Sequence, residues 1–438
     1  MPEEFWGVRL YITGLTASCL STHNCINLEI LRTAGSVWLE GDVVSAIALA
    51  EAAAAARCRQ GSERCTALAS LQLALLLTNL RRIDEARRAV RQATAVLDDP
   101  AINAVTALVR AKIALCDGRI DEAISLCDTG MVVANDPSLA SWASIGSMVS
   151  AIIAMRRGEL ATMIHHANQI KEDVIFGRDG LWGRDTFPWN SPAWLVVQII
   201  EAEKGWKVAV PLARGLLTSE SSTRGLLLSE PSAASFLVRI LLRADDRETA
   251  ERGRRCAAVL AAENPGIHAI AAAALHLEAL LEKDVSLLQQ VAASDCDERT
   301  RSSVNEDIGD LLSESSGGFR QACMHYETAM RSYADAGSPR DSSRVRSKLR
   351  RHDAPKTAAR FWPSSRISVL TDTEYAVAEL VAGGLTNAEV GGQMYLSRHT
   401  VAFHLRKVFQ KVGAKSRIEL AVMWKQLIGQ DLDVASHG

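Results

Sequence analysis

At residues 370–427 the chain reads LTDTEYAVAELVAGGLTNAEVGGQMYLSRHTVAFHLRKVFQKVGAKSRIELAVMWKQL. In three places a Ser or Thr is followed three residues later by Glu, the pattern of a helix N-terminal capping box. These pairs are Thr371 with Glu374, Thr386 with Glu389, and Ser416 with Glu419, and Ser397 caps a fourth helix without the acid. The pattern predicts helices at 372–382, 387–394, 398–412 and 417–428. Two short helices joined by a tight turn are typical of a helix-turn-helix, so this stretch predicts a DNA-reading module.

The third of these helices has two faces when it is unrolled at about 100° per residue. The apolar face predicts a core contact by Val401, Leu405, Val408 and Val412. The opposite face contains no acid, and it is made of His399, Ala402, Phe403, Arg406, Lys407 and Gln410. We call this second set the reading face.

Positive charge is concentrated around the reading face. Between Ser397 and Lys425 there are seven Lys and Arg residues and one acid, Glu419. Arg406 could fork onto guanine O6 and N7, and Lys407, Lys411 and Lys415 could meet phosphates. A run of charge is often only a solvated helix face, but here it lies beside a helix-turn-helix with almost nothing to balance it.

The segments LTDTE, GGLTNAEV and LSRHTVAFHLRKVFQKVGAKSRIELA closely resemble the DNA-binding domain of the LuxR/NarL superfamily. The likeness is greatest to large actinobacterial LuxR regulators of MalT-like architecture. The resemblance implies a four-helix domain, a recognition helix in the major groove, and dimerisation through the fourth helix, where we place Ile418, Val422 and Trp424. It also implies base contacts at Ala402, Phe403 and Arg406. The full set of expected DNA-binding residues is Thr386, Asn387, Arg398, His399, Thr400, Ala402, Phe403, His404, Arg406, Lys407, Gln410, Lys411, Lys415 and Arg417.

This chain departs from the family in three respects. Ala402 stands where many members have a lysine. Gly391 and Gly392 replace helix-favouring residues, which should soften the second helix by roughly 1 kcal/mol per glycine. The chain also has no GxxxxGK[ST] phosphate-binding loop, so we expect a form without the N-terminal ATPase domain of the large regulators.

The preceding region, residues 1–337, is rich in Ala, Leu and Arg, and its apolar residues recur at helical spacing. A turn residue followed five positions later by an apolar residue recurs eight times, at steps of 34 to 47 residues. The turn residues are Gly41, Arg81, Gly118, Gly158, Gly205, Asp245, Lys283 and Gly317. Periods of about 34 to 45 residues are typical of stacked helical hairpins, so we predict an all-α, tetratricopeptide-like array. A helical bundle without repeats is the alternative.

An aromatic segment, Phe176 to Trp194, interrupts the array. Its three tryptophans, Trp182, Trp189 and Trp194, could form a loop that holds a ligand or partner. The simpler interpretation, which we favour, is that they fill an irregular joint between repeats.

A basic helix and a flexible linker, residues 338–368, join the array to residues 369–428, and a tail follows at 429–438. Ser338 and Pro339 mark the start of the helix, which carries six Lys and Arg residues. These cations either contact DNA phosphates or cover the exposed side of a terminal repeat.

The remaining features of the sequence exclude several classes of protein. Nine cysteines without a CxxC pair fit neither a disulfide framework nor a zinc site, and no catalytic signature is present. No apolar run reaches the ~20 residues needed to span a bilayer, and Glu3 and Glu4 stand where a signal peptide needs positive charge. We therefore expect a cytoplasmic protein that is not an enzyme and that uses no cofactor, no metal and no membrane.

The sequence as a whole favours a sequence-specific transcription regulator, with activation expected from the resemblance. Its expected partners are double-stranded DNA, a second copy of the chain, RNA polymerase, and a small-molecule or protein effector on the repeat domain. The alternative is a helical-repeat scaffold that binds a protein partner and uses the helix-turn-helix as a non-specific nucleic-acid tether.

Overall fold

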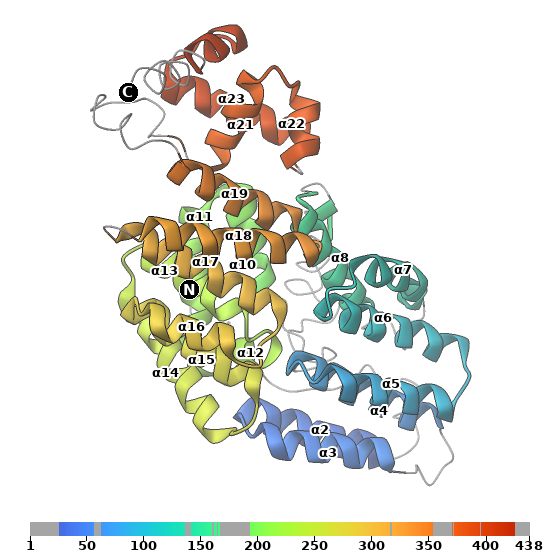
Figure 1. Cartoon of the computed structure of the whole chain (residues 1–438). Helices are drawn as coiled ribbons and strands as arrows, with labels where there is room; N and C mark the ends of the chain where they lie inside the picture. The colour runs from blue at the N-terminus through green and yellow to red at the C-terminus, as the bar shows by residue number, and fades with distance from the viewer. Residues whose placement is uncertain are drawn as a thin grey trace. The chain divides into compact units, whose positions relative to one another are not determined.

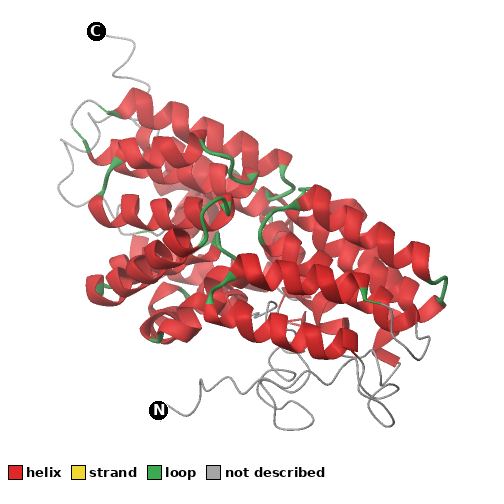
Figure 2. Cartoon of the chain, turned by 90° about the horizontal axis from the view of Figure 1, so that it is seen from below, coloured by secondary structure: helices red, strands yellow, loops and turns green. Residues whose placement is uncertain are grey.

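The computed structural model describes residues 26–56, 63–135, 142–159, 162–163, 165–166, 193–315, 318–353, 370, 372–394 and 396–424. Within these ranges every regular element is a helix, as Figure 2 shows. The predicted all-α class is confirmed. No helix in the described part of the chain is long and apolar enough to cross a membrane.

The chain divides into two compact units (Figure 1). The first comprises residues 1–153 and 162–301, and the second comprises residues 154–161 and 302–438. Two helices, α8 and α17, have residues in both.

Helices α2 to α8 form the first part of the chain, and α4 with α5 shows a long buried helix followed by a shorter amphipathic one. The elements of this part are α2 (Ile26–Glu40), α3 (Val43–Ala55), α4 (Glu63–Asn79), α5 (Ile83–Val96), α6 (Pro100–Cys116), α7 (Ile120–Gly130), a 3₁₀ turn η2 (Met131–Asn135), and α8 (Ala143–Arg157). Helix α4 is buried on all sides from Ala67 to Asn79, whereas α5 buries only one stripe, Ala86, Ala89, Val90 and Ala93. This is the buried-then-amphipathic pairing that the hydrophobic periodicity of the sequence indicates.

The second half of the array continues the pairing. Its helices are α10 (Ala193–Lys204), α11 (Trp206–Thr218), α12 (Glu220–Ser229), α13 (Ala233–Arg243), α14 (Arg247–Glu263), α15 (His268–Glu282), α16 (Val285–Ala293), α17 (Glu298–Glu314), α18 (Phe319–Asp335) and α19 (Pro339–Asp353).

Seven of the eight expected turn residues adopt a left-handed backbone, and the eighth, Gly317, lies outside the described residues. The seven are Gly41, Arg81, Gly118, Gly158, Gly205, Asp245 and Lys283, with φ between 52° and 97°. A left-handed residue reverses the chain directly after a helix, which allows the next helix to pack antiparallel. The regular spacing in the sequence therefore corresponds to regularly spaced helix ends.

The C-terminal module contains α21 (Asp372–Ala382), α22 (Asn387–Met394), α23 (Arg398–Val412) and a helical segment at 417–424. The first three have the bounds that the capping pattern predicts. The end of the fourth lies outside the described residues, as do the linker at 354–369 and the first capping residue, Thr371.

Candidate nucleic-acid interface

The two helices of the helix-turn-helix, α22 and α23, each begin with a side-chain cap. Thr386 and Glu389 form the reciprocal box: the Thr386 amide donates to Glu389 Oε2 over 2.7 Å, and the Glu389 amide donates to Thr386 Oγ1 over 3.3 Å. The hydrogen bond from the Thr386 amide lowers the pKa of Glu389. Ser397 Oγ accepts from the Thr400 amide over 3.0 Å and so starts α23. The two helix starts of the motif are thereby fixed independently of its core.

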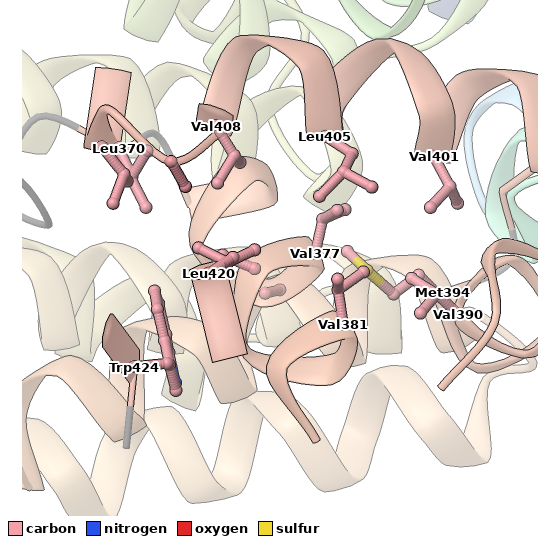
Figure 3. Close-up of a cluster of buried hydrophobic side chains, with 14 residues drawn as sticks. Leu370, Val377, Val381, Val390, Met394, Val401, Leu405, Val408, Leu420 and Trp424 are labelled. Atoms are coloured by element: carbon pink, nitrogen blue, oxygen red, sulfur yellow. The ribbon is translucent and has the colours of Figure 1, made fainter. Parts of the chain in front are cut away.

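The module has its own apolar core, shown in Figure 3. Val401, Leu405, Val408 and Val412 of α23 are all buried, so the predicted inner face of this helix is confirmed. They meet side chains from the other three helices, including Val377, Val381, Val390, Met394, Leu420 and Trp424. Because every helix contributes, the core fixes which side of α23 faces outward.

The outward side of α23 is the reading face. His399, Phe403, Arg406, Lys407 and Gln410 are exposed. Ala402 is half-buried, as are the neighbouring Thr400 and His404. Arg398 at the start of α23 and Lys415 just after its end are also exposed.

Two of the expected DNA-binding cations have partners inside the module. Lys411 Nζ pairs with the carboxylate of Glu374, which is buried on α21. Arg417 donates from Nη1 to Asn387 Oδ1 over 3.1 Å. These two cations connect helices to one another, whereas the charged side-chain groups of Arg406, Lys407 and Lys415 pair with no carboxylate in the described part of the chain. The positive charge offered to a ligand is therefore concentrated on the latter three and on Arg398.

His404, for which the resemblance implies a DNA contact, is more enclosed than its exposed neighbours on α23. Its imidazole is largely enclosed, and Nδ1 is buried without a hydrogen-bond partner among the described residues. Burial lowers the pKa of His404, so the ring is neutral near pH 7. It is therefore less available for a phosphate than its exposed neighbours on α23.

The fourth helix presents two large apolar side chains to solvent. Ile418 is 77% exposed and Val422 is 50% exposed, one turn apart. Trp424 is only 4% exposed, and its ring packs 5.1 Å from that of Tyr375. Trp424 is thus a core residue of the single chain, because the four-helix core needs a large side chain at that end. We remove it from the expected dimer surface.

In the aromatic segment of the first unit, the structure describes only one of the three tryptophans. Trp194 is buried at the start of α10, whereas Trp182 and Trp189 lie outside the described residues. Trp194 lines a small hollow with Lys112, Cys116, Met148 and Glu230. Burial lowers the pKa of Lys112 to about 8, and its ammonium donates to Asn79 Oδ1 over 2.6 Å.

Sequence reasoning missed the role of Glu374. It assigned this acid to a capping box with Thr371, which lies outside the described residues, and Lys411 to a phosphate. The structure pairs Glu374 with Lys411, 37 residues apart in the chain. No local pattern marks such a pair, because it depends on how α21 crosses α23. Within the described residues, no group of three or more His, Cys, Asp or Glu side chains could hold a metal ion.

Comparison with known proteins identifies the module. Residues 368–424 match the family of bacterial regulatory proteins described as the luxR family. A Mycobacterium tuberculosis protein assigned as an HTH-type transcriptional regulator is 40% identical over 65 residues. Those residues are 15% of this chain and 7% of the mycobacterial protein.

Two shorter regulators give similar matches. BvgA of Bordetella pertussis, named as a positive transcription regulator of virulence factors, is 36% identical over 63 residues, which are 14% of this chain and 30% of BvgA. A nitrate/nitrite response regulator homolog of Haemophilus influenzae is 34% identical over 55 residues, 13% of this chain and 26% of that protein. In every case the likeness covers a short part of both proteins, and the chain spans 30% or less of the length of each of these relatives.

Proposed function

We propose, from a C-terminal domain that belongs to the luxR family of bacterial regulatory proteins, that this chain is a sequence-specific DNA-binding transcription regulator. The observation that carries the proposal is the reading face of α23. It combines exposed Arg406 and Lys407 with exposed His399 and Gln410, and it contains no acid. A helix of this kind, supported by a rigid core, fits the major groove of B-DNA.

Different residues of the module have different proposed roles on DNA. Arg406 reads a guanine through its paired N–H groups, and Ala402 and Phe403 contact neighbouring base edges. The backbone contacts come from Thr386, Arg398, Thr400, Lys407 and Lys415. Asn387, His404, Lys411 and Arg417 support these residues from within the module, because their side chains are partly enclosed or bonded to one another.

The proposed assembly on DNA is a dimer. Ile418 and Val422 form an exposed apolar stripe, and two copies could bury it against each other. Two modules related by a two-fold axis would read paired half-sites about one helical turn apart.

We further propose that the helical array controls the module, with activation as the outcome and contact with RNA polymerase as its route. The array would receive a small-molecule or protein effector. The support for this part is architectural: a long series of helices, α2 to α19, precedes the small DNA-binding module on one chain.

The test of the main proposal is selection of bound sequences from random duplex DNA by the full chain. A recovered motif with two related halves is the expected result. Binding that weakens with salt but shows no preference over scrambled duplex would overturn the proposal and favour a scaffold that holds nucleic acid non-specifically.

The first site prediction concerns Arg406. Arg406→Ala should cost about 1 to 3 kcal/mol on the selected site and relax the preference at one base pair. Lys407→Ala should weaken selected and scrambled DNA alike, because a phosphate contact carries no sequence information. Arg88→Ala on α5, an exposed arginine of the other unit, is the control and should change neither. Equal losses on both DNAs for Arg406→Ala would refute its assignment as a base reader.

A further inference from the structure

Two side chains of the reading face, Ala402 and Phe403, cannot form a hydrogen bond with a base, and Phe403 is the larger and more exposed of the two. Phe403 is 43% exposed, and it is the only large apolar side chain of α23 that is exposed. Exposure of an aromatic ring to water is unfavourable, so covering the ring with a binding partner would lower the free energy. Because cations surround the ring, a polyanion is the partner that fits this surface, and we take that partner to be DNA.

Neighbouring side chains cover part of the Phe403 ring and leave the rest available for contact with a ligand. The ammonium of Lys407 lies 4.5 Å from the ring centroid, and the His404 ring lies edge-on at 5.6 Å. Lys407 is one turn further along α23, so its charge covers one ring face while its side chain remains exposed. The rest of the phenyl group points to solvent.

Phe403 and Arg406 must reach neighbouring base pairs. They lie three residues apart, which is a rise of about 4.5 Å along the helix. Successive nucleotides of one DNA strand are separated by about 3.4 Å along the duplex axis. With α23 lying along the major groove, this separation allows the ring of Phe403 to lie over the next base pair or the one beyond it once Arg406 is bonded to a guanine.

Only one base presents an apolar group in the major groove. Guanine, adenine and cytosine offer hydrogen-bond donors and acceptors there, whereas thymine also offers its C5 methyl group. A phenyl ring pressed against a purely polar edge would leave that edge without partners, which is costly. Pressed against a methyl group, the ring gains apolar burial.

We propose that Phe403 selects thymine by contact with its C5 methyl group, one or two base pairs from the guanine read by Arg406. This inference rests on the proposed DNA-reading function and specifies the half-site that the module takes. Lys407 has two roles in it, since its ammonium holds the ring from one side and meets the backbone phosphate on the other.

The experiment removes the methyl group and nothing else. Full-length protein is titrated against its selected duplex and against duplexes in which single thymines are replaced by deoxyuridine. We expect one thymine in each half-site to lose about three- to fivefold in affinity on replacement, the change expected for burial of one methyl group. Thymines outside the half-sites serve as the internal control and should lose nothing.

Variants connect that loss to the ring. Phe403→Ala should bind the thymine and deoxyuridine duplexes equally, whereas Phe403→Leu should retain part of the difference. Arg406→Ala and Lys407→Ala should bind more weakly and still distinguish the two duplexes. Circular dichroism confirms that each variant folds, as expected for substitutions at exposed positions.

The outcomes separate this inference from the function it rests on. A chain that prefers its selected site but is insensitive to every deoxyuridine replacement would overturn the thymine assignment and leave the regulator proposal standing. Sensitivity that persists in Phe403→Ala would also overturn it, since another group would then contact the methyl. Binding without any sequence preference would overturn both the thymine assignment and the regulator proposal.

Discussion

Gly391 and Gly392 are neighbours in α22 with opposite surroundings. A Cβ on Gly391 would lie 2.5 Å from the carbonyl oxygen of Leu396, in the turn that leads to α23. The same turn is closed by the Leu396 amide, which donates to the Gly391 carbonyl over 2.8 Å. A Cβ on Gly392 would meet nothing within 4 Å. The expectation that both glycines merely soften the helix is therefore wrong for Gly391, where the close approach requires a glycine.

The pair supports a prediction with an internal control. Gly392→Ala should stabilise the C-terminal module by about 1 kcal/mol, because alanine favours the helix and fits the open space. Gly391→Ala should destabilise it, since the turn must move. Hydrogen exchange of the α22 and α23 amides, followed by mass spectrometry on the full chain, measures both. Equal effects of the two substitutions would show that the turn is not as close as described.

The titration of His404 provides a second residue-scale prediction. Burial lowers the pKa of His404 below its ordinary value of about 6.5, so folding favours the neutral ring. Its contribution to stability is therefore fully present above pH ~6.5 and is lost as the pH falls through the folded pKa.

We expect an NMR titration of histidine-labelled protein to show one resonance with a low pKa that is absent from His404→Gln. His399, exposed on the same helix, is the matched control. A pKa at or above 6.5 for His404 would contradict the described burial.

At the scale of elements, α19 is held by charge and not only by apolar contact. The carboxylate of Glu306 on α17 pairs with Arg344 and accepts from Lys348 Nζ, the latter over 2.8 Å. Lys348 also donates to Asp310 over 2.6 Å. Two of the six cations that the sequence assigns to a basic helix are therefore turned toward the preceding helices. Arg346, by contrast, is exposed and has no carboxylate partner within the described residues.

Glu306→Gln should loosen α19, because it leaves two partly enclosed cations with one acid fewer. Part of each cation remains in water, so we expect a loss of about 1 to 3 kcal/mol, less than for a fully buried pair. Protection of the α19 amides from hydrogen exchange should fall roughly tenfold or more, since about 1.4 kcal/mol corresponds to a factor of ten. Arg346→Ala is the control and should leave this protection unchanged. Unaltered exchange in Glu306→Gln would show that apolar packing alone holds the helix.

At the scale of the whole first unit, polar contacts join segments that are far apart in the chain. Asn264 accepts from the Val43 amide over 2.9 Å and donates to the Gly41 carbonyl over 2.7 Å, which ties the end of α14 to the first hairpin. Arg81 pairs with Glu230 and lies 3.4 Å from Asp297. A few polar side chains thus connect early and late helices of this unit.

Arg81→Ala should therefore destabilise the unit by about 2 to 4 kcal/mol, because Glu230 and Asp297 are largely enclosed and would lose their cation. Asp245→Ala is the matched control: Asp245 has a similar left-handed backbone at an equivalent turn, with φ 59° against 62°, but it is exposed. It should change stability by no more than about 1 kcal/mol. Denaturant midpoints of the two variants test the difference. Similar shifts would mean that the turn conformation, and not the ion pairs, makes Arg81 important.

The sequence by itself determined the helical class, the positions of the turns and the bounds of three helices of the C-terminal module. These features depend on local chemistry: a cap acts on amides two or three residues away, and helical periodicity decides which side of α23 is buried. The module's family was also readable, because its motif is a continuous stretch of about 60 residues.

Only the tertiary structure decided which charges remain available to DNA and which are used internally. Lys411, Arg417, Arg344 and Lys348 carry the same charge as Arg406, but each meets a partner at least 30 residues away in sequence. It also decided that Trp424 belongs to the core while Phe403 faces outward. The physical reason is the same in each case, since burial and ion pairing depend on how helices cross, and that geometry is set by packing across the whole domain.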